Sequence, residues 1–188
     1  RPVASVTKLM TILLLLEMLD EGTLTLEEEV TVSQNAASMG GSQALLDAGF
    51  DPRGRRVVLL GAGGAASAIA VQAALDGVAE IDVFNRQEAY QQSGYDLIDR
   101  LHAYSECAIS LYALSDEEQL RASLAESALV VNATNVGYPD DPGCLLTADL
   151  LRPELIVADL VYNPRETELI KLARSCGCKT VDGAGPFV

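Results

Sequence analysis

The sequence predicts an α/β protein built on a doubly wound parallel sheet, preceded by a short helical segment of different character. From about residue 50 onward, short apolar runs alternate with helix-length segments, an order typical of parallel βαβ units. The runs 57–60 and 155–158 are apolar on both faces, as strands covered by helices on both sides require.

The predicted elements follow one another regularly after residue 50. The expected strands are 56–60, 80–84, 107–112, 128–131, 155–159 and 179–181, and the expected helices are 64–76, 91–101, 116–125 and 166–176. Before them we expect a helix over 5–21 and a short strand over 29–33, followed by the small-residue stretch 36–43. The organisation changes between residues 43 and 50, so we divide the chain into two domains, residues 1–43 and 44–188.

Composition excludes several classes of partner. The 188 residues carry a formal net charge of −14, and no basic cluster offsets it, so a nucleic-acid backbone would be repelled. The apolar run Leu9–Leu19 is broken by Thr11 and Glu17 and is shorter than the roughly 20 residues that a bilayer requires, so we expect no membrane span. The chain opens on Arg1 rather than Met, so we expect a fragment or a processed piece.

The four cysteines, Cys107, Cys144, Cys176 and Cys178, are too few and too irregular for a disulfide framework. We interpret them as free thiols in a reducing compartment. The Cys176-Gly177-Cys178 pair lacks a second pair of ligands, and His102 is the only histidine. The sequence therefore predicts no metal site.

A glycine turn directly follows the first strand of the predicted sheet and opens a helix. Its sequence, Gly61-Ala62-Gly63-Gly64-Ala65-Ala66, fits the Gly-x-Gly-x-x-Ala arrangement. Gly61 permits the tight turn, Gly63 lets backbone N–H groups approach a pyrophosphate, and Ala66 allows helix and strand to pack closely. The helix N-terminus adds partial positive charge. Glycine-rich turns also serve packing alone, but this context favours a Rossmann-like dinucleotide site.

Further motifs follow the later strands. They are Asn85-Arg86, Asn132-Ala133-Thr134-Asn135-Val136-Gly137, Asp159-Leu160-Val161-Tyr162-Asn163-Pro164-Arg165-Glu166-Thr167 and Asp182-Gly183-Ala184-Gly185. With the glycine turn, these motifs resemble the C-terminal nucleotide-binding domain of the shikimate dehydrogenase family over residues 45–188. The residues around Arg86, with Glu88 beyond it, are similar to those of the quinate/shikimate branch of that family. Tyr138 and Pro186 stand where that family usually has Met.

The resemblance implies a cytoplasmic oxidoreductase of aromatic amino acid biosynthesis that moves hydride between a nicotinamide and the ring hydroxyl of shikimate or quinate. The cofactor-binding residues that it implies are Gly61, Ala62, Gly63, Gly64, Ala65, Asn85, Arg86, Glu88, Asn132, Ala133, Thr134, Asn135, Val136, Leu160, Tyr162 and Gly183. The family's substrate domain, with its catalytic Lys/Asp pair, should precede residue 45 and is absent from this sequence. We therefore expect no catalytic residue here, cofactor binding without turnover, and a small-molecule substrate only where that domain is supplied.

The choice of cofactor depends on the residues after the second strand. Arg86 offers paired donors to a 2′-phosphate, which favours NADP. Glu88 could instead bond the 2′-hydroxyl of NAD, and the two side chains could also simply pair with each other. We predict a site that takes NADP or NAD and prefers NADP.

Residues 1–43 resemble a different family. Ser5 and Lys8, one helical turn apart, read like the Ser-x-x-Lys element of D-alanyl-D-alanine carboxypeptidases, and 36–43 extends that resemblance. The sequence contains no Lys-Thr-Gly, and Ser33-Gln34-Asn35 precedes 36–43 rather than following it. We expect an inactive remnant; the alternative function is a serine-type carboxypeptidase fragment acting on peptidoglycan. The junction is either a natural fusion or a recombined sequence.

Overall fold

The computed structural model describes residues 14–23, 25, 50–86, 91–102 and 105–183, and the chain divides into two compact units, Arg1–Met39 and Gly40–Val188. In the first unit the described residues form a helix over 14–20, inside the helix predicted over 5–21. Its side chains Leu14, Leu15 and Leu16 are all exposed. The strand predicted over 29–33 and the stretch 36–43 lie outside the described residues.

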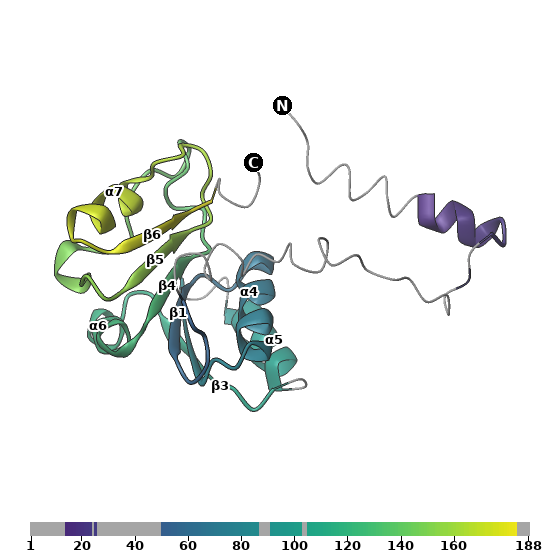
Figure 1. Ribbon diagram of the computed structural model, residues 1–188, viewed down its shortest axis with the longest axis horizontal. Coiled ribbons are helices and arrows are strands. Elements are labelled where there is room, and N and C mark those ends of the chain that lie inside the picture. The colour runs from purple at the N-terminus through teal and green to yellow at the C-terminus, as the bar shows by residue number, and fades with distance from the viewer. Residues whose placement is uncertain (1–13, 24, 26–49, 87–90, 103–104, 184–188) are drawn as a thin grey trace. The chain divides into compact units, whose positions relative to one another are not determined.

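The second unit is built on a parallel six-stranded sheet of order β3-β2-β1-β4-β5-β6 (Figure 1). Its strands are β1 (Arg56–Leu60), β2 (Glu80–Asn85), β3 (Ala108–Ala113), β4 (Leu129–Asn132), β5 (Ile156–Asp159) and β6 (Lys179–Asp182). Its helices are α4 (Gly64–Leu75), α5 (Gln91–His102), α6 (Glu117–Glu126), α7 (Glu168–Ser175) and the short 3₁₀ helix η1 (Ala148–Leu150). The predicted α/β fold is confirmed, and the predicted elements of this unit agree with the observed bounds to within two residues.

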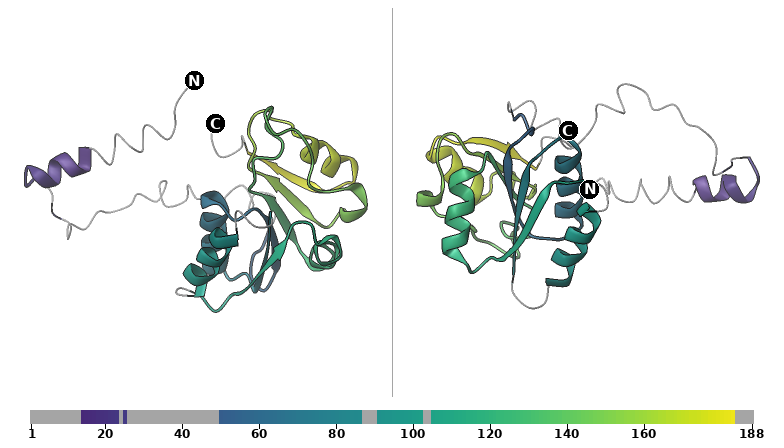
Figure 2. Two further views of the ribbon diagram at one scale, coloured as in Figure 1. Left: turned by 180° about the vertical axis from the view of Figure 1, so that it is seen from behind. Right: turned by 90° about the horizontal axis from the view of Figure 1, so that it is seen from below.

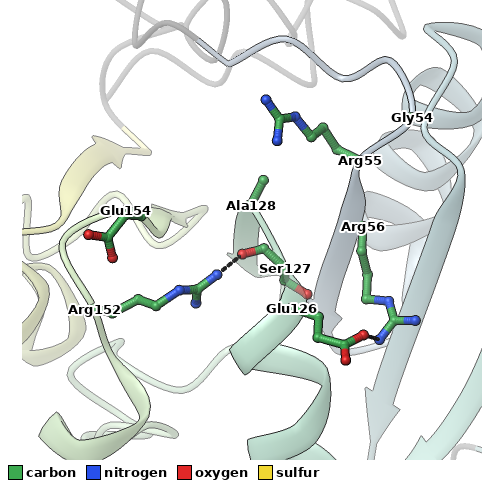
Figure 3. A pocket seen from close by; sticks show the side chains of 8 residues that line it. All are labelled: Gly54, Arg55, Arg56, Glu126, Ser127, Ala128, Arg152 and Glu154. Atoms are coloured by element: carbon green, nitrogen blue, oxygen red, sulfur yellow. Dashed lines mark hydrogen bonds and ion pairs between the residues drawn. The ribbon is translucent and has the colours of Figure 1, made fainter.

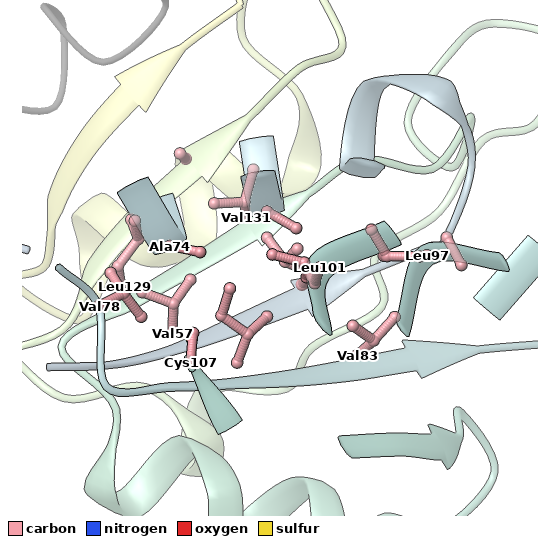
Figure 4. Packing of buried hydrophobic residues seen from close by; sticks show 14 of the residues in the cluster. Val57, Ala74, Val78, Val83, Leu97, Leu101, Cys107, Leu129 and Val131 are labelled. Carbon is pink, nitrogen blue, oxygen red and sulfur yellow. The ribbon is translucent and has the colours of Figure 1, made fainter. Parts of the chain in front are cut away.

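Helices cover both faces of the sheet (Figure 2). Because side chains alternate along a strand, Val57 and Leu59 of β1 face one layer while Val58 and Leu60 face the other. The first layer holds α4 and α5, whose Ala70, Ala74 and Leu97 pack on the sheet; Figure 4 shows this cluster. The second layer holds α6 and α7. Burial on both faces is the physical reason for the continuous apolar runs in the sequence.

One carboxyl group is buried among these apolar side chains. Asp82 of β2 is 1% exposed and is hydrogen-bonded to Ser123 of α6. Its Oδ1 atom has no hydrogen-bond partner among the described residues. Burial raises the pKa of Asp82, while the hydrogen bond to Ser123 acts in the opposite direction.

Two arginines form hydrogen bonds between different elements at the amino edge of the sheet, beside a cavity of about 370 Å³ (Figure 3). Arg56 contacts Glu80 (Nε to Oε2, 2.9 Å) and Glu126 (Nη1 to Oε2, 2.8 Å). Arg152 donates from Nη1 to the carbonyl oxygen of Leu124 (2.6 Å) and from Nη2 to that of Ser127. The cavity is lined by Gly54, Arg55, Arg56, Glu126, Ser127, Ala128, Arg152 and Glu154. The last turn of α6 has no basic residue of its own, so Arg152 supplies the positive charge at that helix end.

We predict that Arg152→Ala lowers the free energy of unfolding by about 2 kcal/mol, because hydrogen bonds from a charged donor to two half-buried carbonyls are lost. The matched control is Arg121→Ala. That arginine pairs with Asp149 on the surface, where both side chains are more than half exposed, so its loss costs at most about 1 kcal/mol. Urea unfolding followed by circular dichroism compares the two variants, and equal losses would contradict the role given to Arg152.

Candidate functional site

The carboxyl ends of β1 and β4 meet where the order of the sheet reverses. β1 pairs with β2 on one side and with β4 on the other, so the chain leaves β1 in one direction and later returns to its opposite edge. In open α/β sheets this switch point is where the connecting loops diverge and leave room for a ligand. The predicted motifs that the structure describes all follow carboxyl ends of strands, which lie at one edge of a parallel sheet.

Gly61 begins the turn after β1 and has two reasons to be glycine. Its φ is +102°, a region that side chains disfavour. A Cβ at this position would also lie 3.0 Å from Cγ2 of Thr134 and 3.1 Å from the carbonyl oxygen of Ala133. The turn is held by a hydrogen bond from the N–H of Gly61 to the carbonyl of Phe84 (2.8 Å). The turn after β1 and the loop after β4 are therefore in direct contact.

The next residues form an open surface at the start of α4. Gly63 is the N-cap of α4, and a Cβ at Gly63 or Gly64 would meet nothing within 4 Å. Gly63, Gly64 and Ala65 are exposed, whereas Gly61 and Ala62 are buried. The first turn carries no acidic side chain, and the first N–H groups of a helix lack partners within it. This arrangement suits an anionic group.

A hydrogen-bonded network shapes the loop that follows β4. The Asn132 side chain accepts hydrogen bonds at Oδ1 from the Thr134 hydroxyl (2.7 Å) and from the Thr134 N–H (3.1 Å). Its Nδ2 donates to the carbonyl of Val136 (3.0 Å), and the N–H of Val136 donates to the Thr134 hydroxyl (3.1 Å). Asn132 and Val136 are buried, while Asn135 is exposed at the tip. Side-chain bonds thus fix the course of this loop.

The same network extends to Asp159 at the end of β5. Its Oδ1 accepts from Nδ2 of Asn132 (2.9 Å) and from the N–H of Val161 (3.0 Å), and its Oδ2 accepts from the hydroxyl of Thr167 (2.6 Å). Burial raises the pKa of Asp159, and these three hydrogen bonds lower it. Thr167 in turn caps α7 by accepting from the N–H of Ile170 (3.2 Å). Asp159 begins one of the sequence motifs, and the structure gives it a role that the motif did not assign, as an acceptor that holds these loops together.

Residues after β5 and β6 complete this edge. A Cβ at Gly183 would lie 2.7 Å from the carbonyl oxygen of Leu160, so the end of β6 approaches the loop after β5 as closely as only glycine allows. Tyr162 is 59% exposed and packs edge-on against Tyr138, with ring centroids 5.5 Å apart. Burial raises the pKa of Tyr138. Two aromatic rings therefore border the loops described above.

Asn85 ends β2 and Arg86 follows it, on the other side of the glycine turn. Asn85 is buried, and Arg86 is exposed. Nη2 of Arg86 lies 3.1 Å from Oδ2 of Asp141, a partner that the sequence motifs did not indicate. The predicted residues Glu88, Ser5 and Lys8 lie outside the described residues, so neither a pair between Arg86 and Glu88 nor the Ser-x-x-Lys element is described.

None of the described helices has the length and apolar character needed to cross a membrane. Among the same residues, no group of three or more His, Cys, Asp or Glu side chains is arranged to hold a metal ion.

Known proteins resemble this chain in two ways. A family model described as D-alanyl-D-alanine carboxypeptidase matches residues 1–71, a range that includes β1, the glycine turn and the start of α4. The curated shikimate dehydrogenase (NADP(+)) of Listeria monocytogenes serotype 4b (strain F2365) is 44% identical over 148 residues, which cover 78% of this chain and 51% of the relative.

Solved structures of shikimate and quinate dehydrogenases are also similar to this chain. Shikimate 5-dehydrogenase from Listeria monocytogenes, in complex with shikimate and NAD, superposes with a TM-score of 0.72 at 43% identity, over 77% of this chain and 50% of that one. Quinate dehydrogenase from Corynebacterium glutamicum, in complex with NAD, gives a TM-score of 0.64 at 30% identity, over 77% and 50%. Through its α/β unit the chain is homologous to shikimate dehydrogenases, and it spans about half the length of the curated relatives that it matches.

Proposed function

We propose that the α/β unit is the NAD(P)-binding part of a shikimate or quinate dehydrogenase. The observation that carries this proposal is the glycine turn at the switch point of the sheet, which opens onto the uncapped start of α4. Relatives whose structures contain NAD or NADP support it. The bound nicotinamide would supply the hydride acceptor for the ring hydroxyl of the substrate.

The residues present fit such a cofactor. The backbone of Gly61, Gly63 and Gly64, with Ala62 and Ala65, would hold the pyrophosphate, since the open surface above Gly63 leaves room for it. Asn85 and Arg86, with Glu88, would contact the adenosine ribose. The loop of Asn132, Ala133, Thr134, Asn135 and Val136 would border the nicotinamide, together with Leu160, Tyr162 and Gly183.

A negative charge introduced at the glycine turn by substitution tests this cofactor site. We predict that Gly63→Asp weakens NADPH binding at least about tenfold more than the isosteric Gly63→Asn, because a carboxylate would repel the pyrophosphate. The backbone of Gly63 is extended (φ −76°, ψ −173°) and its surroundings are open, so both variants should fold; Asp and Asn are favoured N-caps. Titration of nicotinamide fluorescence measures binding in a chain that contains no Trp. Equal affinities of the two variants would overturn the assignment.

We further propose that the chain as given binds cofactor without turning over shikimate or quinate. The described residues include two lysines: Lys171 is paired with Glu168 on the exposed side of α7, and Lys179 begins β6 at the opposite edge of the sheet. Neither stands where the site could use it as a proton acceptor. General acid–base help is worth about 10²- to 10⁴-fold.

We therefore expect no NADP- or NAD-dependent oxidation of shikimate or quinate above the uncatalysed rate. The assay follows the absorbance of the reduced nicotinamide, with a full-length shikimate dehydrogenase as the positive control. Oxidation that is abolished by Gly63→Asp would show that this chain does the chemistry itself and would contradict the proposal.

The family-model match to residues 1–71 favours a second candidate, a serine acyl-enzyme of the carboxypeptidase type built on Ser5 and Lys8. We propose that these residues are an inactive remnant, because the sequence contains no Lys-Thr-Gly element to complete the site. We predict no labelling by a fluorescent penicillin. Labelling of the native chain that disappears in Ser5→Ala would establish the carboxypeptidase-like activity instead.

A further inference from the structure

The ion pair between Arg86 and Asp141 joins two loops on opposite sides of the glycine turn. Arg86 follows β2, and Asp141 lies in the loop after β4. Both strands pair with β1, so their loops flank the turn that starts at Gly61. Nη2 of Arg86 and Oδ2 of Asp141 are 3.1 Å apart.

The backbone holds Asp141 in place. Its N–H donates to the carbonyl of Tyr138 (3.0 Å), and its own carbonyl accepts from the N–H of Gly137 (2.8 Å). The N–H of Tyr138 donates in turn to the carbonyl of Asn135 (3.2 Å), which connects this tight turn to the loop organised by Asn132. The carboxylate therefore projects from a braced segment, and the long side chain of Arg86 is the adjustable partner.

The two side chains of this ion pair are exposed enough to separate when a ligand binds one of them. The Arg86 and Asp141 side chains are 53% and 44% exposed, and an ion pair under such conditions contributes little stability. A 2′-phosphate bound by Arg86 would need the same guanidinium donors, and a carboxylate beside it would repel its charge. A cofactor with a free 2′-hydroxyl makes no such demand.

We propose that Asp141 is a specificity-determining residue that competes with the cofactor's 2′-phosphate for Arg86. It thereby lowers the preference for NADP and keeps NAD usable. This inference rests on the proposed cofactor site and adds to it a residue that governs the choice between the two dinucleotides.

The test compares NADPH and NADH affinities of the full chain at low salt, by nicotinamide fluorescence. We expect Asp141→Asn to tighten NADPH binding about threefold to fivefold and to change NADH binding less than about twofold. The matched control is Asp140→Asn, which removes the same charge from the neighbouring exposed residue. We expect it to change the ratio of the two affinities less than about twofold, since its effect is only long-range and screened.

A double-mutant cycle separates competition for Arg86 from general electrostatics. Arg86→Ala should weaken NADPH binding several-fold and leave NADH nearly unchanged. In that background, Asp141→Asn should have no more effect than Asp140→Asn. An effect of Asp141→Asn that is equal for both cofactors, or undiminished without Arg86, overturns the inference.

Failure of the inference and failure of the proposed function give different results. If the native chain binds both cofactors and Asp141→Asn leaves their affinity ratio unchanged, only the role of Asp141 is wrong. If the native chain binds neither NADPH nor NADH, the proposed function is wrong and the inference falls with it.

Discussion

The Asp159 carboxylate joins three parts of the chain that would otherwise be independent. It is 1% exposed and accepts hydrogen bonds from the Asn132 side chain, the N–H of Val161 and the hydroxyl of Thr167. These donors belong to the end of β4, the loop after β5 and the N-cap of α7. Without this acceptor, the Thr167 hydroxyl and the Asn132 amide would each lose a buried partner, at a cost of about 1–3 kcal/mol per unsatisfied group. The geometry of the candidate site depends on this single buried group.

The two edges of the sheet use different chemistry. At the carboxyl edge, glycine and backbone N–H groups leave an open surface at the start of α4, whose first turn carries no acidic side chain. At the amino edge, Arg56 and Arg152 bind carboxylates and helix carbonyls and so connect β1, β2, α6 and the segment before β5. A parallel sheet makes this separation possible because all its strands end at one edge. The contacts of Arg56 and Arg152 therefore do not occupy the surface available to a ligand.

Local sequence patterns predicted most of the fold, because apolar strands and the glycine turn can be recognised from short runs of consecutive residues. They also placed Gly61 correctly, although its contact with Ala133 and Thr134 depends on the packing of β1 against β4. The ion pair of Arg86 with Asp141 was beyond such reasoning, since the partners are far apart in sequence and Asp141 belongs to no motif. The roles of Glu88, Ser5 and Lys8 stay predictions.

The protonation of Asp82 makes the free energy of unfolding of this protein depend on pH. Because burial raises its pKa in the folded state, that state holds the proton more tightly than the unfolded chain does. Its contribution to the free energy of unfolding is fully present below the ordinary carboxyl pKa and is lost as the pH rises through the raised value. Asp159 shifts in the same direction, whereas Asp51 and Asp149, both exposed, shift the other way. Protonation of Asp82 in mild acid therefore favours the folded state, in contrast to a buried carboxylate that must stay ionised for its protein to remain folded.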